Sequence, residues 1–279
     1  MPDAELERSA RRMHGLVESI HLVTYFAEEP SVALAALGLR DNYWDGYFAG
    51  RAAPLGQVPA EVVHAIFYNF ADGEVARHIP RVWKVTTPQA ALAARQEGSV
   101  AALRRILGDL ADSPGLVRTA DLAIKAGLSA PVVGRPLYAG LRRLPVPDDP
   151  VARLWHAATL IREHRGDGHT AALVGAGIGG TEAHVLHALF DGMPAEKFGR
   201  IHHLPPARLG AVIAGLRKRG LIDDSGWLSP AGRRTKIEIE AMTDRLATPP
   251  LAALDPEELE QLFSGLEPIC AVLDAAGSR

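Results

Sequence analysis

The chain has 279 residues, of which 47% are hydrophobic and 23% charged, a composition that allows a sizeable buried core. Its 30 Lys and Arg side chains are balanced by 33 Asp and Glu side chains, and the formal net charge is -3. Proteins that bind nucleic acid usually carry a basic excess, which this chain lacks. Because Cys270 is the only cysteine, an intramolecular disulfide framework and a cysteine-rich metal site are excluded.

Long apolar runs are missing from the sequence. The N-terminal charges are not followed by an apolar stretch of the signal-peptide type, and no run approaches about 18 apolar residues. We therefore expect a cytoplasmic protein with no membrane partner.

Helical patterns dominate the chain. A helix is predicted from Thr87 to Gly108, because threonine is a good N-cap, proline suits the first helical position and glycine often ends a helix. Asp149 and Pro150 start another helix in the same way. Shorter helices are predicted at residues 61–70, 116–127, 136–144 and 256–276. A hairpin is predicted at residues 220–229, so the expected class is all-α with one small β-hairpin wing.

The segment 144–150 predicts a linker, because its three prolines cannot continue a helix. It divides the chain into an N-terminal helical domain, residues 1–143, and a C-terminal helical domain, residues 151–279.

The two halves also share a weak similarity. Residues 59–67 align with residues 181–190 when one insertion is allowed, and His64 then pairs with His187. An internal duplication and a chance likeness of two Ala-rich helices both stay open. A duplication would predict two related helical units that meet at a cleft.

Residues 181–247 have the order of a winged helix. A first helix at 181–190 is followed by residues 206–220, which have the length and apolar spacing of a recognition helix, and then by the predicted hairpin. Leu228 to Arg234 begins the next helix. This order resembles the C-terminal part of a MarR-type winged-helix domain, whose members typically read "L..L..+GLI", a hairpin, and "LT..G+". The whole chain is also similar to an actinobacterial family often labelled helix-turn-helix, a label that brings no established activity.

The resemblance implies DNA binding, but the residues argue against it. An apolar stripe on the recognition helix would pack on its own domain, and the opposite face is mostly Ala and Gly. Base recognition needs hydrogen-bonding side chains there, and the acidic wing tip, Asp223 and Asp224, would repel phosphates. We therefore expect the Ala/Gly face to pack against protein, in a winged helix adapted to another use. Under the DNA-binding alternative, the contacts would come from Arg208, Lys218, Arg233 and Arg234.

The densest polar cluster lies near the end of the helix that starts at Pro150. Gly166 and Gly168 predict a sharp exit from this helix, which would let polar side chains converge. Glu163 or Asp167 could then act as a general base, with His164 or His169 as its acid partner. Arg162 and Arg165 could hold a substrate oxyanion or carboxylate. The structural alternative is a helix end crossed by salt bridges, followed by a plain turn.

A second set of candidate ligand-binding residues lies in the N-terminal half. His21 and Tyr25 share one helix face, while Arg51 and Asn69 are polar residues in aromatic stretches. The alternative is that His21 and Tyr25 are ordinary core or surface residues, and that Arg51 and Asn69, if buried, have structural partners instead of a ligand. The two histidines at residues 202–203 are predicted to lie in a loop. No recognised metal-ligand spacing is present, and we expect neither a metal nor a cofactor.

These observations predict a small-molecule-binding protein with its site in a cleft between two helical halves. If it is an enzyme, cofactor-independent acid–base chemistry is expected, such as hydrolysis, elimination or isomerisation. The alternative is a MarR-like DNA-binding transcriptional regulator that responds to a small ligand. A homodimer is kept open under either hypothesis.

Overall fold

The computed structural model describes residues 3–39, 43–198 and 204–277, which fold almost entirely into helices, so the predicted all-α class is confirmed. The first six α-helices are α1 (Asp3–Phe26), α2 (Glu28–Ala35), α3 (Tyr43–Ala52), α4 (Ala60–Phe67), α5 (Pro88–Leu107) and α6 (Pro114–Ser129). They are followed by α7 (Pro136–Arg142), α8 (Pro150–Gly175), α9 (Gly180–Phe190), α10 (Pro206–Lys218), α11 (Pro230–Leu246) and α12 (Pro256–Gly277). Short 3-10 segments lie at Ala53–Leu55, Val75–Arg77, Arg81–Lys84, Gly108–Asp112, Ala195–Lys197 and Leu251–Ala253.

The two N-caps expected from the sequence are present. The Thr87 side chain accepts a hydrogen bond from the backbone N–H of Ala90 at 3.1 Å, and the Asp149 carboxylate accepts one from Ala152 at 2.8 Å. Each bond satisfies one of the backbone donors that a helix start leaves free. The helices α5 and α8 therefore begin where the sequence predicts.

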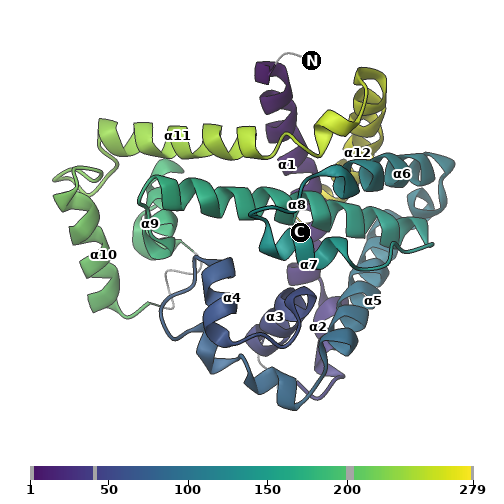
Figure 1. The fold of residues 1–279 in the computed structure, drawn as a ribbon, viewed down its shortest axis with the longest axis horizontal. Helices are drawn as coiled ribbons and strands as arrows, with labels where there is room; N and C mark the ends of the chain where they lie inside the picture. Colours follow the sequence, from purple (N-terminus) through teal and green to yellow (C-terminus); the bar gives the residue numbers. More distant parts are fainter. Residues whose placement is uncertain (1–2, 40–42, 199–203, 278–279) are drawn as a thin grey trace.

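Helix α8 crosses the middle of the molecule (Figure 1). The largest apolar cluster surrounds its N-terminal half and combines residues of α1, α5, α6 and α12 with Val151, Leu154 and Trp155 of α8. Helices from both sides of segment 144–150 therefore share one core. The division into two domains and the internal duplication stay predictions.

Two further apolar clusters include residues of α8, one near its middle at Leu160 and one near its C-terminal end. One joins α2, α3, α4 and α7 around Phe48 and Tyr138. The other joins α9, α10 and α11 with Leu173, near the C-terminal end of α8. The helices of the predicted winged helix thus share an apolar cluster with the end of α8.

The predicted hairpin is much reduced. The described residues contain no β-strand, and residues 220–229 form a tight turn with one antiparallel bridge between Ile222 and Leu228. The backbone N–H of Asp223 donates to the Trp227 carbonyl at 2.9 Å. The segment is too short to add the further ladder bonds that would make it a strand pair.

The predicted helix exit at Gly166 and Gly168 is wrong, because α8 continues to Gly175. Gly168 serves a different purpose: a methyl group there would overlap the guanidinium of Arg135. Arg135 donates to the His164 carbonyl at 2.7 Å and to the Leu246 carbonyl at 2.8 Å. The glycine therefore allows a buried arginine to lie against the helix rather than allowing the chain to turn.

None of the described helices is long and apolar enough to cross a membrane.

Candidate functional site

A polar cleft of about 460 Å³ lies along the second half of α8. Residues of α1, α4, α8, α9 and α11 form its walls. The sequence-predicted candidates on this cleft are Arg51, Asn69, Arg162, Glu163, Arg165, Asp167 and His169. The polar cluster of α8 therefore does lie on a cavity, although α8 stays helical throughout.

A smaller cavity of about 190 Å³, here called the inner pocket, lies between the end of α1, α2, α3 and α5. Tyr25 and Arg51 are the predicted candidates that line it. Among the residues that line the two cavities, Arg51 is the one they share.

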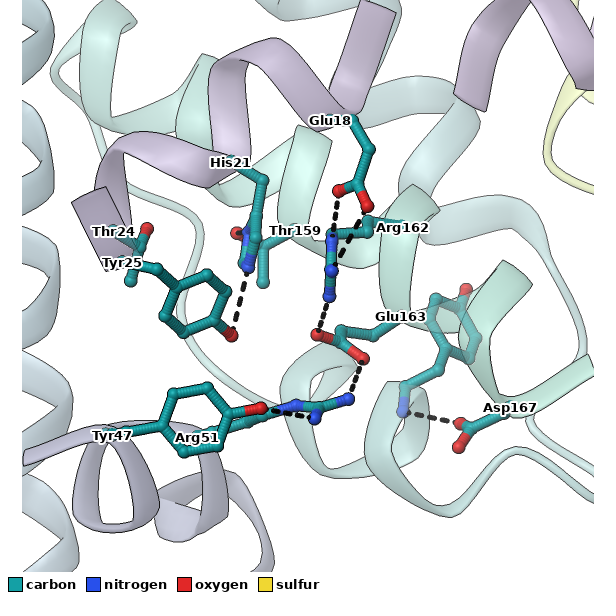
Figure 2. Close-up of polar contacts among 12 residues, drawn as sticks. Glu18, His21, Thr24, Tyr25, Tyr47, Arg51, Thr159, Arg162, Glu163 and Asp167 are labelled. Atoms are coloured by element: carbon teal, nitrogen blue, oxygen red, sulfur yellow. Dashed lines mark hydrogen bonds and ion pairs between the residues drawn. The ribbon is translucent and has the colours of Figure 1, made fainter. Parts of the chain in front are cut away.

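An ion-pair network runs along the wall of the cleft (Figure 2). Arg162 lies between two carboxylates: its Nε is 2.5 Å from Glu18 Oε2, and its Nη1 is 2.8 Å from Glu163 Oε1. Arg51 contacts the other oxygen of Glu163 at 3.4 Å and donates to the Tyr47 hydroxyl at 2.7 Å. Glu163 thus joins α8 to α3 through Arg51, and Arg162 extends the network to Glu18 of α1.

Burial by itself would raise the pKa of Glu163, but the positive charges of Arg51 and Arg162 outweigh this effect and the pKa lies below its usual value. A carboxylate held in this way stays ionised at neutral pH. It is a weak proton acceptor there and a strong anchor for the two arginines. Its geometry fits the salt-bridge alternative as well as a ligand site.

Asp167 lies one turn further along α8 and caps the start of α7. Its carboxylate accepts a hydrogen bond from the Tyr138 backbone N–H at 3.0 Å (Figure 2). Burial, only partly offset by that bond, raises the pKa of Asp167 to about 7. Asp167 is therefore the predicted acid–base candidate whose proton can exchange near neutral pH.

The two histidines of the cluster have different surroundings. His164 is 0% exposed and packs edge-on against Tyr138, and both of its ring nitrogens lack a hydrogen-bond partner among the described residues. Burial lowers its pKa to about 3. His169 lines the cleft, where its Nδ1 lies 3.0 Å from the Thr243 hydroxyl, and burial lowers its pKa to about 4. Both imidazoles are therefore neutral at pH 7, and the catalytic roles of these residues stay predictions.

His21 and Tyr25 share one face of α1, as the spacing predicts. His21 is fully buried, with Nδ1 3.0 Å from the Thr159 hydroxyl and Nε2 3.3 Å from the Tyr25 hydroxyl. Burial, together with nearby arginines, lowers the pKa of His21 well below its usual value. His21 thus supports Tyr25 from behind, and Tyr25 reaches the inner pocket.

Arg165 links the cleft to α11. Its guanidinium contacts Glu240 at 3.2 Å and Asp244 at 3.0 Å. Arg11 of α1 contacts the same two carboxylates. Helices α1, α8 and α11 are thereby tied together at one end of the cleft.

No group of described His, Cys, Asp or Glu side chains has a geometry that could hold a metal ion.

A model of a helix-turn-helix family matches residues 10–278, nearly the whole chain. The chain belongs to this helix-turn-helix family. No curated protein and no solved structure matches it.

The candidate recognition helix of this helix-turn-helix protein is α10, and its position corrects one expectation. The Ala/Gly face of α10 does not pack against protein: Ala207, Gly210, Ala211 and Ala214 are all exposed. A methyl group added at Gly210 or Gly215 would meet no atom within 4 Å. Helix α10 lies at the outer edge of the molecule (Figure 1), held from the inner side by Leu209 and Leu216.

The four residues of the DNA-binding alternative, Arg208, Lys218, Arg233 and Arg234, are all exposed. Arg233 lies over the Phe190 ring at 5.4 Å. Asp223, at the wing tip, accepts hydrogen bonds from the Ser225 hydroxyl and the Trp227 backbone N–H, so its carboxylate is engaged within the turn. The histidine pair at 202–203 lies outside the described residues.

Several residues of the two cavities were missed by the sequence argument. Glu18, His14 and Glu240 line the cleft, and Arg95 lines the inner pocket. Arg95 carried a usable signal, because it lies on the small-residue stripe of α5 with Ala91, Ala94 and Gly98. A charged residue on a buried stripe needs a partner, either in the protein or in a ligand.

Proposed function

We propose that this protein is a DNA-binding transcriptional regulator with a MarR-like winged helix, and that it responds to a small ligand bound beside α8. The observation that carries the proposal is the outward, uncovered face of α10. An α-helix in the major groove must be free along its outer side over several turns, and α10 has this freedom.

Charge near α10 supports the same function in spite of the net charge of -3. Residues 206–219 contain four cationic side chains, Arg208, Arg217, Lys218 and Arg219, and no acidic one. Arg233 and Arg234 add two more at the start of α11. Neutralisation of phosphates by such residues supplies most of the affinity of a protein for DNA.

The small side chains on α10 also have a consequence for the kind of binding. Ala and Gly allow the helix to come close to the groove, but they donate no hydrogen bonds to base edges. We infer that contacts to the DNA phosphate backbone supply most of the affinity. The preference for particular DNA sequences then comes from few side chains, and Arg208 is the first candidate. Arg208 is in the first turn of α10, the part of a recognition helix that enters the groove most deeply.

The ligand response is supported by the position of the cleft. Its walls combine α8 with α9 and α11, so a ligand there would contact both the central helix and the helices that hold α10. A ligand that prefers one spacing between these helices would change the presentation of α10.

The proposal is tested by fluorescence anisotropy with labelled genomic duplex fragments at low and rising salt. We expect binding at low salt that weakens steeply as salt rises. The double variant Arg208→Ala, Lys218→Ala should bind about tenfold more weakly, with a log–log salt slope smaller by about two. No binding at low salt would overturn the proposal.

The control for each of the single substitutions, Arg208→Ala or Lys218→Ala, is Arg118→Ala, in α6. Arg118 is exposed and donates one hydrogen bond to Gln261, far from α10. This variant removes a positive charge of the same kind and should leave DNA affinity unchanged. An equal loss of DNA affinity in Arg118→Ala and in the α10 variants would indicate nonspecific charge attraction and contradict a role for α10.

A further inference from the structure

The inner pocket combines apolar and aromatic side chains with two arginines, of which Arg95 is buried and Arg51 half-buried. Leu34, Leu39, Tyr25 and Tyr47 are among its lining residues, and Arg51 and Arg95 provide the charged groups. In Figure 2, Tyr25 and Tyr47 lie near one another, with Arg51 beside them. Their ring centroids are 5.1 Å apart.

Arg95 is the unusual member of this pocket. It is 2% exposed, and no described carboxylate lies within 4 Å of its guanidinium. Its hydrogen-bond contacts are with neutral groups: the Gly50 carbonyl at 3.3 Å and His21 Nε2 at 3.5 Å. Its Nε has no hydrogen-bond partner in the part of the chain that the structure describes, and the Trp155 ring lies 5.3 Å away. A buried cation with such weak partners is costly unless an anion joins it.

The neighbouring carboxylates cannot fill this role. Glu163 is bound by Arg51 and Arg162, and the second carboxylate of the network, Glu18, is bound by Arg162. Three arginines, counting Arg95, therefore share two carboxylates, which leaves one uncompensated positive charge. Of the three arginines, Arg95 is the one without a described carboxylate within 4 Å, and it lines the inner pocket.

We infer that the inner pocket binds a small organic anion, a carboxylate with an apolar or aromatic body, whose charged end contacts Arg95. A planar guanidinium suits a carboxylate because two parallel hydrogen bonds can form. The volume of about 190 Å³ also fits, since a cavity of roughly 150 Å³ already holds benzene. Bare phosphate would leave the leucine and tyrosine wall without a partner.

Burial lowers the pKa of Arg95, in agreement with a cation that lacks a strong partner. An anion bound there would oppose this effect. The inference goes beyond the proposed function, because it concerns ligand binding alone and holds whether or not α10 binds DNA.

The test is isothermal titration calorimetry of the full chain with sodium benzoate at constant ionic strength. We expect one site for benzoate, with benzyl alcohol and inorganic phosphate at least about tenfold weaker. Benzyl alcohol keeps the ring without the charge, and phosphate keeps the charge without the ring. Absence of benzoate binding up to about 10 mM would overturn the inference, as would phosphate binding as tightly as benzoate.

Two variants locate the site. Arg95→Met should lose at least about tenfold in benzoate affinity, while Arg118→Met, on the surface of α6, should keep it. Ala35→Trp leaves Arg95 intact and places a large ring where the exposed Ala35 lines the pocket, so it should also block benzoate. Thermal melts verify that each variant is folded. Unchanged benzoate affinity in either folded pocket variant would contradict this site.

Discussion

Tyr68 and Gly180 are in direct contact where α4 meets the start of α9. A methyl group at Gly180 would overlap the carbonyl oxygen of Tyr68 and lie 2.7 Å from the Asn69 Cα. Tyr68 has a left-handed φ of 56°, and its hydroxyl donates to the Ile178 carbonyl at 2.6 Å. This backbone-to-backbone approach sets the distance between the helical core and the helices that carry α10.

Gly180→Ala should therefore destabilise the protein. Because the clash is with backbone rather than with a movable side chain, we expect the free energy of unfolding to fall by about 1–3 kcal/mol. Urea denaturation measures it as a lower midpoint at unchanged slope. The control is Gly15→Ala in α1, where the added methyl meets no atom within 4 Å, and a gain of up to about 1 kcal/mol is expected. Equal stability of the two variants would contradict the close contact.

Glu163→Gln tests the ion-pair network of the cleft. Glu163 is 2% exposed and pairs with Arg51 and Arg162, so its loss leaves Arg51 without its counter-charge, while Arg162 keeps only Glu18. We expect a loss of about 3–5 kcal/mol in the free energy of unfolding, measured by urea denaturation. The exposed Glu97 offers the matched control Glu97→Gln, with an effect within about 0.5 kcal/mol. A Glu163→Gln variant as stable as the wild type would show that the network contributes little.

Asp167→Asn should change the pH dependence of stability. The pKa of Asp167 is about 7 in the folded chain, above its ordinary value of 3.8, so the folded state holds a proton that the unfolded state has lost. The extra proton contributes to the free energy of unfolding. This contribution is complete below pH 3.8 and decreases as pH rises towards 7, by up to about 1.4 kcal/mol per pH unit. The stability of Asp167→Asn relative to wild type should therefore rise from pH 4 to pH 7 and then level off.

Denaturation series at pH 4, 5, 6, 7 and 8 measure this difference. The control is Asp109→Asn, at an exposed aspartate, whose difference from wild type should be small and flat across the series. A flat difference for Asp167→Asn as well would mean that Asp167 is ionised in the folded chain at all these values.

Buried histidines predict a loss of stability in acid. Burial lowers the pKa of four of them from 6.5 to between about 3 and about 4: His14, His156, His164 and His169. The unfolded chain takes up these protons first as pH falls below 6.5, so stability decreases down to about pH 4. The four imidazoles outweigh Asp167, which acts in the opposite direction.

His164→Phe isolates one of these contributions. Phenylalanine keeps the edge-on contact with Tyr138 and cannot be protonated. We expect the slope of stability against pH between 6.5 and 4 to decrease by about 1.4 kcal/mol per pH unit. Denaturation midpoints at several pH values measure it, and an unchanged slope would mean that His164 is protonated when folded.

The sequence predicted those parts of the fold that depend on local chemistry. The starts of α5 and α8 followed from Thr87 and Asp149, because a capping side chain and the helix it begins are neighbours in the chain. The predicted end of α8 was wrong because Gly168 makes room for the guanidinium of Arg135, which belongs to a distant segment of the chain. Local turn preference cannot reveal such a contact.

The site shows the same distinction. The polar cluster of α8 was found from its composition, but its network with Glu18 and Arg51 joins helices that are distant in the sequence. The exposed face of α10 was misjudged because small side chains suit both close packing and open solvent. Only the positions of the neighbouring helices decide between these two surroundings.

Arg51 lines both the inner pocket and the cleft, so the two cavities share one charged side chain. An anion held by Arg95 in the inner pocket would also attract Arg51 and weaken the contact of Arg51 with Glu163 in the cleft. If the anion changes the affinity of the cleft for a compound held by Glu163, thermodynamic reciprocity requires that this compound change the affinity of the inner pocket for the anion by the same factor. A ligand for either cavity could thus be detected by its effect on the other.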